Sequence, residues 1–330
     1  MKKVTILGLS SLIIGVIIAT ISFSMVGFNP NKMLLEFRKI QSDEYGPSYS
    51  KKLSSFDRIK IKSNAAVVVK YGDEYKVTAK NSKGSQNNYY VKNGELIVSS
   101  KHHARNSFNL IGLGTAMYTT KITITIPKGV SLTNYYQDST SLIMNGIKVN
   151  NALRLSGNGS VNLTNVNAGS LHVDSDYGDI KVKHSSFKVH PSELDTSDGR
   201  IMIENNHFSS LGVNNENGNI TLNNNIIDYS TGEITNENGQ INLGSNTWNT
   251  LKVKNDNGDI LFTHQLINRG FTAESENGNI IGKASKSDNA RIVGKTSNGK
   301  VTIDQDIQSF NGNKIYSFKN DNGDISIANG

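Results

Sequence analysis

The sequence predicts an all-β protein: a parallel β-helix, or β-solenoid, of about 20 residues per coil, preceded by an irregular β segment and one N-terminal transmembrane helix. Three observations predict this architecture. Glycine recurs at a nearly constant interval in the C-terminal half, β-branched residues follow each of these glycines at fixed offsets, and the N-terminus carries a long uncharged apolar run. A repeat of this length must stack on its neighbours to bury an apolar face.

The N-terminal run begins after Met1-Lys2-Lys3 and covers residues 4–28 without a charge. At about 1.5 Å per residue, a helix of this length reaches about 37 Å, which crosses a hydrocarbon core of roughly 30 Å. The alternative is a cleaved signal peptide, whose nearest small-x-small site is Ser22-Phe23-Ser24. We expect residues 1–28 to form a cytoplasmic tip and a single-pass membrane anchor, with the C-terminal domain outside the cell.

Residues 29–52 read as a juxtamembrane stalk, because a short helical stripe of Met33, Leu34, Phe37 and Ile40 follows Pro30. Residues 53–150 form a β-rich but irregular segment that starts the solenoid. Its predicted strands cover residues 56–61, 66–73, 75–78, 91–98 and 119–126. Residues 101–118 show no pattern and are expected to form a loop.

Residues 151–330 are predicted to be the solenoid repeats. Each unit has an apolar-x-apolar strand, a polar tetrad ending in glycine, and a second strand of alternating aliphatic residues. The nine glycines are Gly159, Gly178, Gly199, Gly218, Gly239, Gly258, Gly278, Gly299 and Gly323. The leucine-rich-repeat frame and the calcium-binding nonapeptide repeat are both absent, which leaves a parallel β-solenoid.

The position two residues after each glycine is β-branched in every unit. We therefore expect one interior column, to which Ile180, Ile201, Ile220, Ile241 and Ile260 contribute. The position before each glycine is most often asparagine, which tolerates a positive φ at a sharp turn. Five of these, Asn217, Asn238, Asn257, Asn277 and Asn298, are expected to stack as an amide ladder.

One position further upstream, four successive units carry an acidic residue: Glu216, Glu237, Asp256 and Glu276. Carboxylates about 4.8 Å apart repel one another, so the column is expected to project into solvent. The alternative is a weak Ca²⁺ site, since Ca²⁺ prefers oxygen ligands.

Charge is unevenly distributed along the chain. The total of +7 combines a basic half, residues 1–149, with an acidic half, residues 150–330. The basic half adjoins the predicted membrane span and lacks interleaved aromatic residues, so we expect no nucleic-acid binding. The chain has no cysteine, which excludes disulfides, cysteine ligands and a cysteine nucleophile.

The chemistry expected from the sequence is sparse. The densest acidic group is Asp174, Asp176, Asp179, Asp195 and Asp198 with Arg200, yet these residues occupy turn positions that every coil shares. The seven histidines have no metal-ligand spacing, although His172 with His190, and His184 with His207, could meet on adjacent coils. No G-x-S-x-G, H-E-x-x-H or P-loop occurs. We therefore expect no enzyme, no catalytic or metal-ligating residues and no cofactor.

Several strings in residues 53–330 carry a family resemblance: F-D-x-I-x-I, V-K-N-G-E-L-I-V, K-I-T-I-T-I-P-K-G-V-S-L and the N-G-x-I repeats. The chain resembles the putative adhesin family of bacterial surface proteins with β-strand repeats, a domain of unknown function. The resemblance implies a membrane anchor, an outward β-solenoid and, in Gram-positive bacteria, a link to cell-envelope stress. It implies no catalytic residues.

These observations predict a membrane-anchored extracellular β-solenoid that acts by binding, as an adhesin or an envelope-stress-associated surface protein. The expected partners are the membrane and a cell-wall polymer, glycan or surface protein. Two alternatives stay open. A carbohydrate-active β-helix enzyme requires a groove that gathers acidic side chains. A tethered sensor of anionic envelope polymers requires salt-sensitive binding to polyanions.

Overall fold

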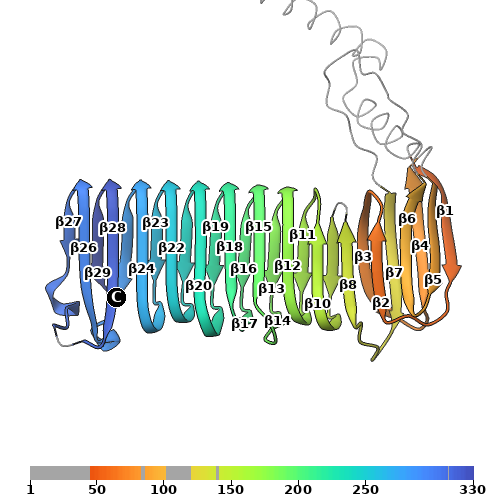
Figure 1. Cartoon of the computed structure of the whole chain (residues 1–330), viewed down its shortest axis with the longest axis horizontal. Coiled ribbons are helices and arrows are strands. Elements are labelled where there is room, and N and C mark those ends of the chain that lie inside the picture. Colours follow the sequence, from red (N-terminus) through yellow and green to blue (C-terminus); the bar gives the residue numbers. More distant parts are fainter. Residues whose placement is uncertain (1–44, 83–85, 102–119, 139–140, 311) are drawn as a thin grey trace, which may run out of the picture.

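A computed structural model describes residues 45–82, 86–101, 120–138, 141–310 and 312–330 of the chain. They form a rod in which the strands lie across the long axis and two sheets face each other (Figure 1). The predicted all-β solenoid is therefore confirmed. The predicted anchor, residues 4–28, lies outside the described residues. So does the predicted loop, residues 101–118, except Lys101, which is the last residue of β6 rather than part of a loop. Among the described residues, no helix has the length and apolar character needed to cross a membrane.

The strands of sheet A follow one another along the rod in this order: β1 (Tyr45–Lys52), β4 (Lys76–Ser82), β7 (Thr120–Pro127), β3 (Ala65–Gly72), β9 (Leu142–Asn145), β11 (Val161–Thr164), β13 (Ile180–Lys183), β16 (Ile201–Glu204), β19 (Ile220–Asn223), β21 (Ile241–Gly244), β23 (Ile260–Thr263), β25 (Ile280–Ala284), β29 (Ile325–Asn329) and β27 (Val301–Ile303). Strand β1 overlaps the end of the predicted stalk, since residues 45–52 pair with β4.

The strands of sheet B, from the N-terminal end of the rod, are β5 (Gln86–Lys92), β6 (Glu95–Lys101), β2 (Arg58–Lys62), β8 (Asn134–Asp138), β10 (Lys148–Ser156), β12 (Asn167–Tyr177), β14 (Ser186–Phe187) with β15 (Ser192–Asp198), β17 (His207–Phe208) with β18 (Leu211–Asn217), β20 (Ile226–Asn238), β22 (Thr247–Asn257), β24 (Leu266–Asn277), β28 (Lys314–Asn322) and β26 (Ala290–Asn298). Two 3₁₀ helices, η1 (Lys286–Asp288) and η2 (Gln305–Ile307), lie near the C-terminal end.

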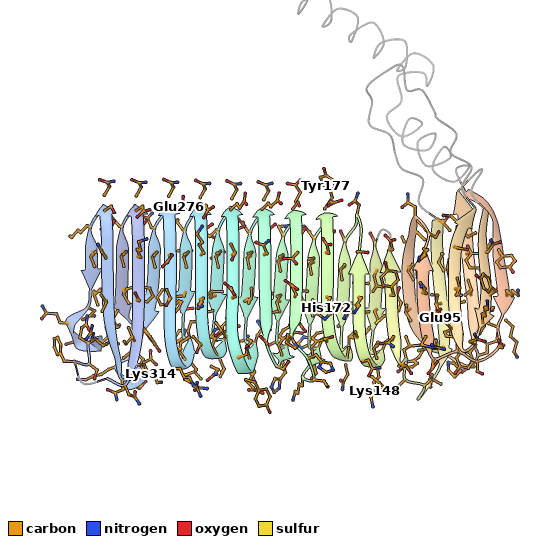
Figure 2. All side chains as sticks on the ribbon, in the orientation of Figure 1. Glu95, Lys148, His172, Tyr177, Glu276 and Lys314 are labelled. Atoms are coloured by element: carbon orange, nitrogen blue, oxygen red, sulfur yellow. The ribbon has the colours of Figure 1, made fainter. Side chains whose placement is uncertain are left out.

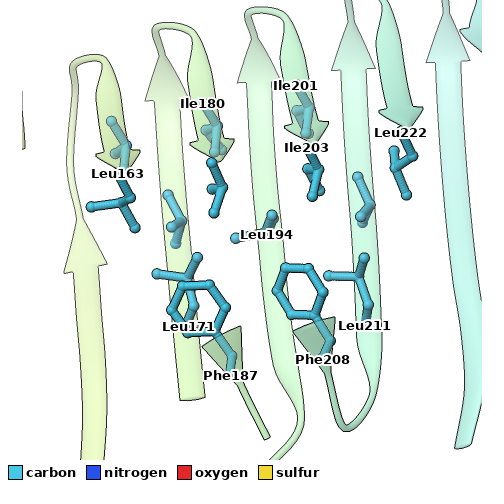
Figure 3. Packing of buried hydrophobic residues seen from close by; sticks show 14 of the residues in the cluster. Leu163, Leu171, Ile180, Phe187, Leu194, Ile201, Ile203, Phe208, Leu211 and Leu222 are labelled. Carbon is cyan, nitrogen blue, oxygen red and sulfur yellow. The ribbon is translucent and has the colours of Figure 1, made fainter. Parts of the chain in front are cut away.

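The core runs along the rod between the two sheets (Figure 3). The predicted interior column is confirmed: Ile180, Ile201, Ile220, Ile241 and Ile260 are neighbours on successive strands, and each is at most 1% exposed. Period-2 alternation explains this arrangement, because every second residue of a strand faces the same side. Aromatic side chains pack in the same core, as in the stack of Phe187 on Phe208 with ring centroids 5.2 Å apart.

The glycine turns stack directly on one another. Gly239 has a φ of 130°, and a Cβ added there would lie 2.2 Å from the carbonyl oxygen of Gly218 on the preceding coil. Only glycine accepts both this φ and this approach of two backbones. Lack of space also explains why residue 232 is glycine, because a Cβ there would lie 2.2 Å from the ring of Trp248.

The predicted asparagine ladder is confirmed through its first four members. The amides of Asn238, Asn257 and Asn277 each donate to the side-chain oxygen of the preceding asparagine, at 3.0–3.1 Å. The expected fifth step was wrong. Asn322 donates to Asn277 at 3.1 Å, and Asn298 donates to Asn322 at 3.0 Å.

That difference reflects the order of the coils at the C-terminal end. Strands β28 and β29, the last in the sequence, lie between the coil of β24 and β25 and the coil of β26 and β27. The outermost coil, β26 and β27, therefore comes earlier in the sequence than the coil that lies inside it, β28 and β29. The N-terminal end uses the same arrangement, because β2 and β3 lie between β6 and β7 on one side and β8 and β9 on the other.

A second amide ladder lies inside the rod, at the corners that follow β16, β19, β21 and β23. Asn206 donates to Asn225 at 3.1 Å, Asn225 to Asn246 at 3.0 Å, and Asn246 to Gln265 at 3.3 Å. These side chains also donate to backbone carbonyls of the corner, as Asn206 does to Val182 at 2.9 Å. The ladder therefore satisfies buried polar groups where the backbone leaves the sheet.

Candidate binding surfaces

The interior of the rod is packed, so contact with another molecule must use its outer faces and edges. Two depressions among the described residues, of about 360 and 290 Å³, lie along the corner edge. The larger one is lined by His264, Lys283 and Asp288 among others, and the smaller one by Glu204 and neighbouring amides. Neither gathers a pair of carboxylates in a groove of the kind that glycoside hydrolysis requires.

The acidic group singled out in the sequence divides between two places. Asp179 lies in the turn and pairs with Arg200 of the next coil at 2.7 Å, while backbone N–H of Arg200 donates to the same carboxylate at 3.0 Å. These bonds to Arg200 hold the pKa of Asp179 below its usual value. Asp174 and Asp195 instead lie opposite each other on the outer face of sheet B. Asp179 thus joins two stacked coils at the turn, whereas Asp174 and Asp195 form a carboxylate pair on a sheet face.

The pKa of the Asp195 carboxyl is raised. Partial burial, then the charges of Glu193 and Asp174, raise its pKa to about 6. The folded state therefore binds this proton more tightly than the unfolded state, whose pKa is near 3.8. The contribution of Asp195 to stability falls as pH rises from about 4 to 6, because this carboxyl ionises first in the unfolded state in that window.

Asp195→Asn removes this repulsion, so we expect a melting temperature higher by about 2–4 °C at pH 7.5 and nearly unchanged at pH 4. Glu233→Gln is the matched control, since it removes one exposed charge from the same face. The measurement is thermal unfolding of the full chain at both pH values. An equal rise for both variants would show a general charge effect rather than repulsion at Asp195.

The described histidines do not gather at one place, and His207 is opposite Ser186 rather than beside His184. His172 lies on sheet B, where burial, then Arg154, lower its pKa, with His190 adding a smaller effect. His184 sits at a corner with a φ of 50°, and His207 pairs with Asp228. Among the residues that the structure describes, no group of three histidine or acidic side chains could hold a metal ion.

The predicted acidic column lies along the turn edge of the rod. Glu216, Glu237 and Glu276 are exposed, as is visible for Glu276 in Figure 2. Lys254 lies between two members of the column, 2.8 Å from Asp256 and 3.7 Å from Glu276. The column therefore projects into solvent, and Lys254 neutralises part of its negative charge.

The outer face of sheet A has the opposite charge near the N-terminal end of the rod. Lysines point outward from β1, β4, β7, β3 and β13: Lys52, Lys76, Lys80, Lys121, Lys70, Lys181 and Lys183. The first acidic residue on this face is Glu204 of β16, which pairs with Lys183 at 2.5 Å. Sequence reasoning found the basic half of the chain but not this face, because the antiparallel pairing of β1 and β4 has no signature in the repeat.

One family of known proteins matches the sequence of this chain. Residues 56–231 match the family described as Toastrack DUF4097. No curated protein matches the chain at a significant level. The family match covers a shorter range than the resemblance seen in the sequence, which extends over residues 53–330.

Several solved structures are similar in outline. A putative adhesin from Parabacteroides distasonis ATCC 8503 is 12% identical, with 85% of this chain and 96% of that chain covered and a TM-score of 0.44. A putative lipid binding protein from the same organism is 12% identical, with 84% and 96% covered and a TM-score of 0.42. A putative cell adhesion protein from Clostridium sporogenes ATCC 15579 is 10% identical, with 86% and 99% covered and a TM-score of 0.21. At these scores the likenesses carry no argument about activity.

Proposed function

Because the chain belongs to the Toastrack DUF4097 family and offers only the outside of a packed rod for contact, we propose that it is a membrane-anchored, extracellular binding protein without catalytic activity. In this proposal residues 4–28 anchor the chain in the cell membrane, and the solenoid presents its faces to a cell-wall polymer, a glycan or a surface protein. The role is that of an adhesin or of an envelope-associated surface protein.

One observation carries the proposal: the inward face of every coil is filled by side chains of the same rod. The interior column is at most 1% exposed, and the corners are closed by the inner amide ladder. A β-helix enzyme holds its substrate in a groove beside paired carboxylates or charged residues. Here Asp174 and Asp195, the carboxylate pair from the acidic group of the sequence, lie on a strand face, while the depressions lie at the corner edge.

The topology can be tested with single cysteines, because the natural chain has none. Tyr229 is 76% exposed at the corner edge of the rod, so Tyr229→Cys gives an accessible probe. We expect a membrane-impermeant maleimide to label Tyr229→Cys in intact cells and to label Lys3→Cys only after lysis. Labelling of Lys3→Cys but not of Tyr229→Cys in intact cells would reverse the topology and contradict the proposal.

A further inference from the structure

The outer face of sheet A, from β1 to β13, carries seven lysines and no carboxylate. The seven residues, here called the lysine track, are Lys52, Lys70, Lys76, Lys80, Lys121, Lys181 and Lys183. The remaining outward side chains described on these strands are small, hydroxylated, amide or aliphatic residues. The outer face of sheet B differs, because acidic residues such as Asp174, Glu193 and Glu233 point outward there.

The strand registers bring like charges together on this face. Lys80 lies directly opposite Lys121, and Lys52 lies directly opposite Lys76. Like charges placed directly opposite each other destabilise a sheet. Lys52 also reaches Glu74 at 3.1 Å, in the turn before β4. A bound anion would remove the repulsion between the opposed lysines.

The lysines form rows that run along the rod rather than along the strands. Neighbouring strands are about 4.8 Å apart, so residues at the same level of successive strands line up parallel to the rod axis. Lys52, Lys76 and Lys70 belong to one row, and Lys80 and Lys121 to another. Between the rows lies a line of hydroxyls from Ser50, Thr78 and Thr123, with Ser50 and Thr78 oxygens 3.4 Å apart.

We propose that the lysine track binds a linear, densely charged anionic polymer whose charged groups are phosphates. The inference rests on the proposed function, since it names the chemistry of the partner that the exposed rod would meet. Ammonium groups and hydroxyls together satisfy the several acceptor oxygens of a phosphate. Rows parallel to the rod axis let one extended polymer contact the lysines of β1, β4, β7 and β3, and continue past β9 and β11 to Lys181 and Lys183 of β13.

The residues of the lysine track favour a phosphate polymer over two other partners, a single-stranded nucleic acid and a membrane surface. Single-stranded nucleic acid is held largely by stacking of bases on aromatic side chains. The described outward positions between the lysines carry none, and the ring of Tyr49 on β1, 41% exposed, is already stacked on Tyr89. Proteins that lie on a membrane surface insert apolar anchors such as Trp, Phe and Leu beside their basic residues. Here the outward apolar residues include no Trp, Phe or Leu among the described positions, and the most exposed is Ile143 of β9, 49% exposed and opposite Val68 of β3.

The test uses the full-length chain in a neutral detergent and inorganic polyphosphate as the probe. The track variant combines Lys70→Gln, Lys76→Gln, Lys80→Gln and Lys121→Gln. The matched control removes the same net charge elsewhere, from outward or turn positions on coils of the C-terminal half: Lys252→Gln, Lys295→Gln, Lys300→Gln and Lys319→Gln. Short-chain phosphatidylglycerol serves as the lipid probe, and circular dichroism confirms that both variants are folded.

We expect the wild-type chain to bind polyphosphate with an affinity that falls as salt rises. The track variant should lose at least about tenfold in affinity and show a flatter salt dependence, whereas the control should change less than about twofold. Equal losses in both variants would show diffuse attraction and overturn the proposal. Absence of polyphosphate binding would overturn it too, and binding of the lipid alone would identify a membrane face instead. None of these outcomes depends on the cysteine-labelling result, so the two proposals can fail separately.

Discussion

Ile220→Asp is expected to prevent folding of the solenoid. Ile220 is 0% exposed and stacks between Ile201 and Ile241, so an aspartate there would bury a charge without a partner. The neighbouring coils cannot move apart to admit water, because the turn glycines and both amide ladders fix their spacing. Loss of soluble protein, or loss of the cooperative melting transition in circular dichroism, would report the effect.

Two further variants make this result specific. Thr221→Asp places the same charge one residue along β19, on the outer face, and should leave the melting temperature nearly unchanged. Ile220→Ala removes only hydrocarbon, one methylene and two methyl groups, and should lower the unfolding free energy by about 2–5 kcal/mol. A soluble Ile220→Asp protein with a wild-type melting curve would contradict the inward register of the column.

Deletion of residues 314–330 is expected to destabilise more of the rod than it removes. In a solenoid whose coils follow chain order, this deletion would trim the tip. Here β28 and β29 separate the coil of β24 and β25 from the coil of β26 and β27, so the deletion removes an interior coil. The outermost coil then loses its only strand partners in both sheets, since β26 pairs with β28 and β27 pairs with β29.

Limited proteolysis measures this effect. In the deleted chain, residues 290–303 should be cut quickly, while cleavage sites in β20–β23 should keep their wild-type resistance. A pair of point variants provides the control within the intact chain. Ile325→Asp, which charges a 0% exposed position of the interior coil, should cost much more stability than Ile303→Asp in the half-buried outermost coil. Equal costs, or continued protection of residues 290–303 after the deletion, would contradict the order of coils seen here.

The repeated part of the fold could be predicted because each coil has the same kinds of residue at the same distances from its glycine. Ile180, Ile220 and Ile260 hold one offset from glycine, and a common offset in stacked coils places them in one column. The asparagine before glycine predicted the outer ladder for the same reason. The inner ladder also has a fixed offset, seven residues after glycine at Asn206, Asn225 and Asn246. It was missed because an asparagine in a corner is ordinarily solvent-exposed.

The order of the coils at the C-terminal end could not be predicted from the same rule. The turns at Gly299 and Gly323 carry equivalent sequences, and either fits on the turn at Gly278. The choice depends on the connections through η1 and η2, where Ile307 is buried against the end of the core. The lysine track was hidden for a related reason. Lys80 and Lys121 are 41 positions apart in the sequence, and only the antiparallel pairing of β4 with β7 makes them neighbours.

The interior position of the coil of β28 and β29 also determines how the rod would respond to mechanical load. A rod whose last strand lies at its tip can be peeled by a pull on that strand, one row of hydrogen bonds at a time. In this protein a pull on the C-terminal end of β29 acts on a strand held by β25 on one side and β27 on the other. Both rows of hydrogen bonds must break before the strand is released. A tether loaded from this end would therefore resist a stronger force than a simply wound solenoid of the same length.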